Sequence, residues 1–178
     1  MILVLAATAE ELAGAPDGAV CGVGPVEAAA RAAAAVAVRQ PAAVVNVGLA
    51  GARAFDAPRF VIGSEAVYCD ADDPRWIELR AQPDPLLVAA ARRALPDAAV
   101  EPIGTSARVG GAGETCAVEA MEGYAVLRAA ALAGVPALEV RVLANAIAEP
   151  DRAKWRLADA RAALAAALPR LVEELGRA

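Results

Sequence analysis

The chain has 178 residues, a formal net charge of −5 and no histidine. This length is enough for one domain with a sizeable core. The charge and the absence of any basic run argue against a nucleic-acid partner, and the lack of histidine excludes histidine triads and most zinc sites. Acid–base chemistry must then come from carboxylates or from Cys21, Cys69 or Cys116, whose spacing fits no CxxC motif. We expect inert thiols in a reducing, cytoplasmic setting.

Strands and helices alternate along the first half of the chain. The apolar run at residues 1–6 predicts a buried strand, because it lacks a basic flank and two glutamates follow it closely, unlike a signal peptide. No stretch is long and apolar enough for a membrane span. Pro25 favours a helix start. We expect strands at residues 19–23, 43–49 and 60–68, and a helix at residues 26–39.

The second half continues the same alternation. Helices are predicted at residues 85–95, from Glu119 or Met121 to residue 133, and at residues 152–175 with an interruption near Pro169. Residues 100–109 and 136–143 read as extended. The pattern indicates one α/β domain spanning residues 1–178, a three-layer sandwich in which helices flank a twisted, mostly parallel (mixed) sheet. Ligands in such folds bind at the carboxyl ends of the strands.

Three groups of residues are candidates for a binding or catalytic role. Gly22 and Gly24 suggest a dinucleotide loop, but Glu27 stands where a third glycine belongs, so a tight turn fits equally well. Glu10 and Glu11 follow the first strand, where they either stabilise a helix N-terminus or supply a general base. Glu119 and Glu122 lie three apart and would share one face of a helix, either a solvated face or a junction.

Several motifs resemble the purine nucleoside phosphorylase and hydrolase superfamily. They are VVNVGLAGA at residues 44–52, VEAMEG at 118–123, VPALEVRVLAN at 135–145 and DRAKW at 151–155. Within the superfamily these residues are most similar to the futalosine hydrolases, which release hypoxanthine from futalosine on a route to menaquinone. The resemblance implies the sandwich fold, a small-molecule purine nucleoside as substrate, no cofactor, no metal and no membrane partner, and a homo-oligomer (dimer or larger).

The resemblance also implies roles for individual residues. Ala50 and Gly51 would line the pocket for base and ribose, where glycine allows the backbone to approach a ligand. Met121 would pack on the ribose, and Glu122 would accept hydrogen bonds from its hydroxyls. Glu11, rather than its neighbour, falls on the position that activates water, which favours hydrolysis over phosphorolysis.

Asn145 bears on the identity of the base. Adenine-cleaving relatives carry aspartate at this position, whereas an asparagine can donate to a 6-oxo group and accept from a protonated N7. Asn145 therefore favours hypoxanthine or guanine, unless it only caps a turn. Arg141 is expected either to bind substrate and orient this neighbourhood or to form a structural ion pair.

The chain departs from the superfamily pattern in its middle. It is shorter than the pattern leads us to expect, and residues 104–109 hold no aromatic side chain to stack on the base. Either Arg108 stacks there instead or the pocket is looser. Two alternatives to futalosine hydrolysis remain: a methylthioadenosine/S-adenosylhomocysteine-type or other purine nucleosidase, and a non-catalytic nucleoside-binding protein.

Overall fold

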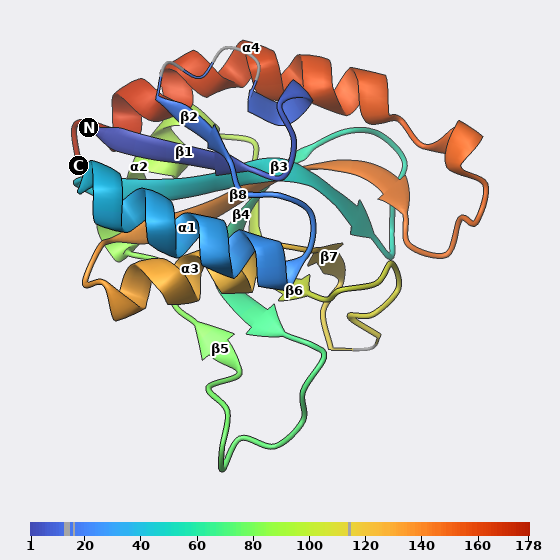
Figure 1. Ribbon diagram of the computed structural model, residues 1–178. Coiled ribbons are helices and arrows are strands. Elements are labelled where there is room, and N and C mark those ends of the chain that lie inside the picture. Colours follow the sequence, from blue (N-terminus) through green and yellow to red (C-terminus); the bar gives the residue numbers. More distant parts are fainter. Residues whose placement is uncertain (13–14, 16, 114) are drawn as a thin grey trace.

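The computed structural model describes residues 1–12, 15, 17–113 and 115–178 (Figure 1). Strands and helices alternate along it, and most lie where the sequence predicts them. The strands are β1 (Ile2–Ala6), β2 (Gly18–Val20), β3 (Ala43–Ala52), β4 (Phe60–Tyr68), β5 (Arg80–Ala81), β6 (Ala99–Thr105), β7 (Val118–Ala120) and β8 (Ala137–Ala146). The helices are α1 (Pro25–Arg39), α2 (Pro85–Ala94), α3 (Gly123–Leu132) and α4 (Leu157–Leu175), with 3₁₀ turns η1 (Glu10–Leu12) and η2 (Arg152–Lys154).

The strands form one eight-stranded sheet in the order β2-β1-β3-β7-β6-β4-β5, and β8 pairs with both β3 and β4. Because β8 joins strands that lie apart in this order, β3, β8, β4, β6 and β7 close into a ring. Most of the pairings are parallel, while β3 with β7, β4 with β5 and β4 with β8 are antiparallel. The mixed, mostly parallel sheet is confirmed, and its closure into a ring is an addition that the strand pattern did not predict.

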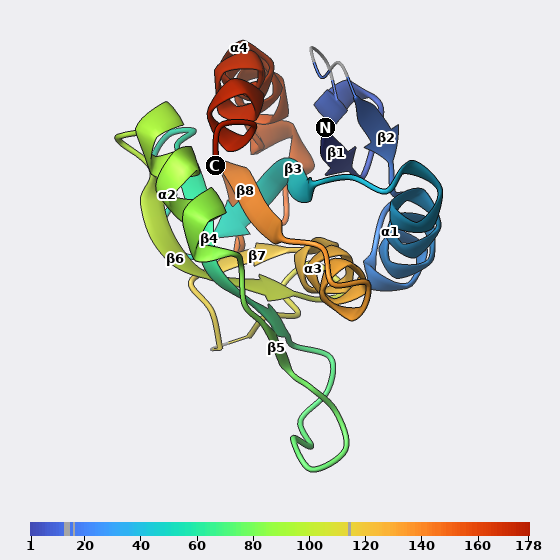
Figure 2. The ribbon, with the colours of Figure 1, turned by 90° about the vertical axis from the view of Figure 1, so that its left-hand side faces the viewer.

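Helices cover both faces of the sheet (Figure 2). Helices α2 and α4 pack with β1, β3, β4 and β8 in one apolar cluster, and α1 and α3 pack on the other side in a second cluster. Alanines such as Ala28, Ala32, Ala90 and Ala130 are fully buried in these layers, so the helices can approach closely. The three-layer α/β sandwich is confirmed.

Several local predictions were wrong. The helix expected at residues 152–175 begins only at Leu157, after the turn η2, and the strand expected at residues 19–23 ends at Val20. Residues 118–120 form β7, so Glu119 lies on a strand and does not share a helical face with Glu122. Pairing of β7 with both β3 and β6 outweighs the helical pattern here. Helix α4 also runs through Pro169 without a break, because buried leucines on both sides of the proline hold the helix against the sheet.

The sheet determines where a ligand site can form. Strands β1, β3 and β8 are parallel neighbours, so their carboxyl ends meet at one edge. The turn η1 follows β1 at this edge, and α4 crosses near it (Figure 1). Among the described residues, no helix is long and apolar enough to cross a membrane.

Candidate active site

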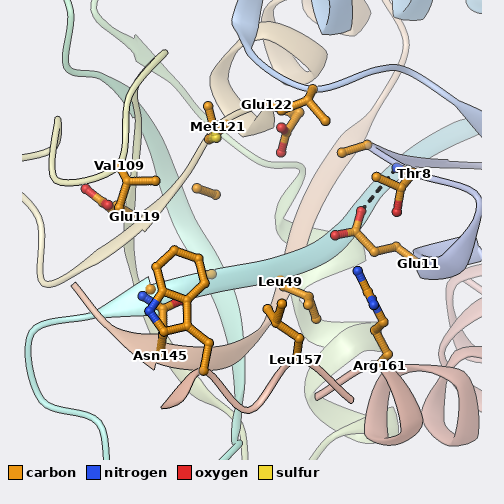
Figure 3. Close-up of a pocket in the computed structure, with 16 residues that line it drawn as sticks. Thr8, Glu11, Leu49, Val109, Glu119, Met121, Glu122, Asn145, Leu157 and Arg161 are labelled. Atoms are coloured by element: carbon orange, nitrogen blue, oxygen red, sulfur yellow. Dashed lines mark hydrogen bonds between the residues drawn. The ribbon is translucent and has the colours of Figure 1, made fainter. Parts of the chain in front are cut away.

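A cavity of about 200 Å³ lies at this edge of the sheet (Figure 3). Separate parts of the chain form its wall, among them the segment after β1, the end of β3, the β7–α3 junction, the end of β8, and the start of α4 with the segment before it. The lining includes Ala7, Thr8, Glu11, Leu49, Ala50, Gly51, Glu119, Met121, Glu122, Asn145, Trp155, Leu157 and Arg161. Six of the seven residues assigned from the sequence therefore surround one cavity, and Arg141 is the exception.

Glu11 enters the cavity from η1, directly after β1. Its Oε2 accepts a hydrogen bond of 3.3 Å from the backbone N–H of Thr8. Burial raises the pKa of the Glu11 carboxyl, and the nearby Glu122 adds to the rise, while Arg141 and Arg161 oppose it. Its neighbour Glu10 is exposed and does not line the cavity. Of the two glutamates, Glu11 lines the cavity and Glu10 does not.

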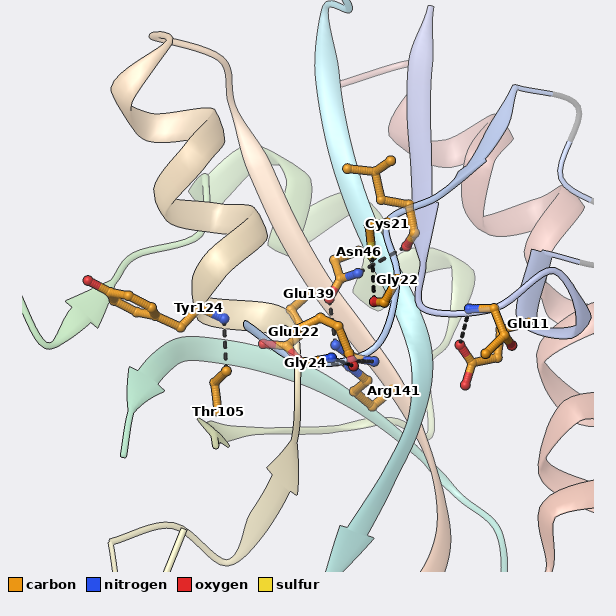
Figure 4. Close-up of polar contacts among 12 residues, drawn as sticks. Glu11, Cys21, Gly22, Gly24, Asn46, Thr105, Glu122, Tyr124, Glu139 and Arg141 are labelled. Carbon is orange, nitrogen blue, oxygen red and sulfur yellow. Dashed lines mark hydrogen bonds and ion pairs between the residues drawn. The ribbon is translucent and has the colours of Figure 1, made fainter. Parts of the chain in front are cut away.

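Glu122 lies across the cavity, at the start of α3. Its side chain is almost completely buried, and both carboxylate oxygens are held (Figure 4). Oε1 accepts a hydrogen bond of 3.1 Å from the backbone N–H of Gly24, and Oε2 lies 3.2 Å from Nη1 of Arg141. Two anchors from distant parts of the chain therefore fix the orientation of this carboxylate.

Arg141 lies one layer behind the cavity rather than in its wall. Its guanidinium donates to Oε1 of Glu139 at 2.8 Å and to Oδ1 of Asn46 at 2.5 Å, besides pairing with Glu122. Burial disfavours the charge on Arg141, but Glu139, Glu122 and Glu11 outweigh burial and raise its pKa. Arg141 therefore stays charged and is placed to hold Glu122, not to touch a ligand.

Asn145 lies near the end of β8, opposite Gly51 on β3. Its Nδ2 donates to the carbonyl of Ala146 at 3.0 Å. An amide has two N–H donors and an acceptor oxygen, so one donor and the acceptor are left for a ligand. A side chain at position 51 would begin 3.1 Å from Nδ2 of Asn145. Gly51 thus gives this amide room in the cavity, next to Ala50.

Glu119 has a structural role that sequence reasoning did not identify. Its carboxylate accepts hydrogen bonds from the backbone N–H groups of Gly110 and Ala112, at 2.5 and 3.1 Å. It thereby folds the loop after β6 against β7. As a result Val109 lines the cavity, while Arg108 lines a separate hollow beside Asp70. Arg108 therefore does not take the place of the missing aromatic residue.

Trp155 is the aromatic side chain of the cavity wall. It follows η2, and its Nε1 donates to the carbonyl of Glu149 at 3.0 Å, while Arg152 stacks on the ring at 5.4 Å from its centre. Both contacts hold the indole in place. The motif at residues 151–155 was noted in the sequence, but nothing there indicated that its tryptophan would reach a cavity formed by β3 and β8.

The cysteines do not offer an alternative base. Cys21 and Cys116 are buried free thiols, and burial raises the pKa of each to about 11. Burial also raises the pKa of the Cys69 thiol. All three therefore remain protonated at neutral pH. Within the described part of the chain, no group of three or more acidic or cysteine side chains could hold a metal ion.

The buried position of Arg141 predicts a large stability effect. Arg141→Met leaves the carboxylates of Glu122 and Glu139 buried without their cation, and the expected loss in the free energy of unfolding is about 3–5 kcal/mol. Urea unfolding at neutral pH measures it. The control is Arg31→Met, which breaks the exposed pair with Glu27 and should cost less than about 1 kcal/mol.

The deficit of Arg141→Met should also depend on pH. Burial already raises the pKa of the Glu139 carboxyl, and without the cation nothing opposes this rise, so the folded state is least disfavoured at low pH and loses stability as pH increases. The difference from wild type should therefore shrink toward low pH. A deficit that is small, or equal at all pH values, would contradict a role for Arg141 in neutralising these carboxylates.

Comparisons with known proteins agree on the fold. No protein-family model matches the chain. Over 57 residues it is 49% identical to futalosine hydrolase of Streptomyces coelicolor (strain ATCC BAA-471 / A3(2) / M145), a match that spans 32% of this chain and 24% of the relative. Two solved structures superpose on nearly the whole chain. S-adenosylhomocysteine nucleosidase of Streptococcus pyogenes, in complex with 5-methylthiotubericidin, is 23% identical with a TM-score of 0.85, and the match covers 98% of this chain and 96% of that one. Futalosine hydrolase of Helicobacter pylori strain 26695 is 15% identical with a TM-score of 0.85, and the match covers 97% of each chain. The chain therefore has the fold of the futalosine hydrolases and methylthioadenosine/S-adenosylhomocysteine nucleosidases.

Proposed function

We propose that this protein is an N-ribosyl hydrolase that cleaves futalosine to hypoxanthine and dehypoxanthine futalosine, a step toward menaquinone. One observation carries the proposal: Glu11, Glu122 and Asn145 come from three distant parts of the chain and converge on one cavity. The local identity to a futalosine hydrolase and the shared fold support it.

The arrangement suits attack of water on the anomeric carbon of a nucleoside. Glu11, with its raised pKa, is placed to take a proton from a water below C1′. The C–N bond then breaks through a sugar with oxocarbenium character, as in glycosidases. Glu122, rigidly held, would accept hydrogen bonds from the ribose hydroxyls and stabilise the positive charge that grows on the sugar. Met121 would pack against the ribose.

Two features favour hydrolysis of a 6-oxopurine over the alternatives. A carboxylate at Glu11 repels phosphate, so phosphorolysis would lose its nucleophile. The free N–H of Asn145 can donate to a 6-oxo group, whereas an adenine would present a second donor there. Trp155, in the same wall, offers a ring on which a purine can stack.

We further propose a single domain over residues 1–178 that works in the cytoplasm as a homo-oligomer. Three free cysteines support a reducing compartment. Large apolar side chains on α1 and α3 support self-association, since Val26 and Leu132 are 82% and 73% exposed.

Product analysis tests the function directly. The purified protein is incubated with futalosine, inosine and methylthioadenosine, and free bases are separated by chromatography. Hypoxanthine should appear fastest from futalosine, and little adenine should form. Adenine as the main product would identify a methylthioadenosine-type nucleosidase instead, and no free base from any of the three would indicate a binding protein.

Glu11→Gln should slow futalosine hydrolysis about 10²–10⁴-fold while futalosine still binds, because the amide cannot take the proton from water. Rates of hypoxanthine release and calorimetric affinity measure the two effects. Glu10→Gln is the matched control, and its rate should stay within a few-fold of wild type, since Glu10 is exposed outside the cavity.

The pH profile gives a second readout of Glu11. A general base must be ionised, so kcat/KM for wild type should fall toward low pH with an apparent pKa above the 4.5 of an unperturbed glutamate. A profile without this acidic limb would contradict the assignment, as would a Glu11→Gln enzyme of nearly normal rate.

Asn145→Asp should shift the preference from 6-oxo toward 6-aminopurines. An ionised carboxylate repels O6, whereas a protonated one can serve N7 and a 6-amino group, provided that the cavity raises its pKa. The measurement is the ratio of kcat/KM for futalosine to that for its 6-amino counterpart, in wild type and variant. If this ratio stays constant, Asn145 does not read the base.

A further inference from the structure

The cavity contains a cation that the reaction described above does not use. Arg161 lies one turn after Leu157 on α4, and both side chains line the cavity. Residues four apart share a helix face, so the same face of α4 that covers the cavity presents this guanidinium to it. Figure 3 shows Arg161 reaching up from α4 toward Glu11, on the side of the cavity away from Glu122 and Met121.

The guanidinium of Arg161 lacks hydrogen-bond acceptors among the described residues for part of its donor groups. Its Nε is buried, and within the described part of the chain it has no hydrogen-bond partner. Arg161 also forms none of the ion pairs among the described residues, although its charge lowers the pKa of Glu11. A buried guanidinium N–H without an acceptor is costly. Its planar set of donors matches a carboxylate, which it can bind through two parallel hydrogen bonds.

The position of Arg161 relative to a bound nucleoside follows from the proposed function, on which this inference rests. With the base at Asn145 and the ribose hydroxyls at Glu122, the 5′ carbon leaves the sugar on the side opposite the hydroxyls. That side faces the wall formed by Leu157 and Arg161. A substituent at the 5′ position would thus run along Leu157 toward the guanidinium.

We propose that Arg161 binds a carboxylate on the 5′ substituent of the nucleoside, and so selects carboxylated nucleosides over neutral ones. Futalosine carries a carboxyphenyl ketone chain at its 5′ end, whereas inosine and methylthioadenosine end in a neutral group. The apolar side chain of Leu157 offers a surface for the phenyl ring, and Arg161 offers the counter-ion at its end. The start of α4 then acts as the specificity element of the site.

The test compares two substrates in two variants. Values of kcat/KM are measured for futalosine and for inosine with wild type, Arg161→Gln and the control Arg170→Gln. Arg170 is an arginine on α4 outside the cavity whose guanidinium donates to the carbonyl of Arg93. Arg161→Gln should lower the futalosine-to-inosine ratio about 10- to 100-fold, the range expected for loss of a hydrogen-bonded charge pair. Arg170→Gln should leave the ratio unchanged. Any effect that Arg161 exerts through Glu11 acts on both substrates and cancels in the ratio.

A binding experiment separates this inference from the proposed function. Affinities for futalosine and inosine are measured by calorimetry with Glu11→Gln and with the double variant Glu11→Gln/Arg161→Gln, so that no turnover is needed. A selective loss of futalosine affinity supports the carboxylate site even if the chain proves not to hydrolyse nucleosides. An equal effect on both ligands, or none, overturns it and leaves Arg161 as a residue that only tunes Glu11. The affinity for inosine 5′-monophosphate is measured in the same way. If it equals the affinity for futalosine and falls when Arg161 is replaced, the site binds phosphate, and the carboxylate assignment is overturned.

Discussion

The buried guanidinium of Arg141 is the contact on which the arrangement of this site depends. It joins Asn46 on β3, Glu139 on its own strand β8 and Glu122 at the start of α3. It passes close to the backbone of β3, where Gly48 leaves the necessary room: a side chain there would begin 2.5 Å from Nη1. Burying such a charge contributes little net stability. Its effect is instead to fix one carboxylate oxygen of Glu122 in a direction that solvent cannot alter.

This fixed carboxylate also shapes the chemistry of Glu11. Two glutamates face the same cavity, and their mutual repulsion, together with burial, raises the pKa of the one that is less tightly paired. Glu122 has a cation at 3.2 Å, whereas among the described residues Glu11 forms no ion pair and accepts one hydrogen bond, from the backbone of Thr8. Two identical side chains thereby acquire different environments, one with a raised pKa that suits a proton acceptor and the other held in place by Arg141 and the backbone of Gly24. A chain without histidine can obtain acid–base chemistry in this way.

Local sequence patterns predicted most of the helices and strands and part of the candidate site. The bounds of β4 were predicted to the residue, and those of α1 and α2 to within one residue, because apolar runs and proline starts are local signals, whereas β8 runs three residues beyond its predicted end. Glu119 was misplaced because β7 has only three residues, and its strand state comes from pairing with β3 and β6 rather than from its own pattern. Trp155 and Arg161 were also missed. Arg161 lies between Leu157 and Leu164 at the three- and four-residue spacing of one helix face, so the leucine pattern of α4 already indicated that it faces the sheet.

The two walls of the cavity therefore differ in how they are held. Residues that suit the reaction, Glu122 and Asn145 among them, lie at strand ends and junctions that backbone pairing fixes in register. Residues that suit the variable part of a substrate, Leu157 and Arg161, lie in the first turns of α4, on the same face as the leucines that pack this helix on the sheet. Substitutions on the exposed side of that helix disturb neither the sheet nor the carboxylates. Structures with under a quarter of their residues identical share this fold, so the fold itself leaves the side chains that line the cavity free to differ.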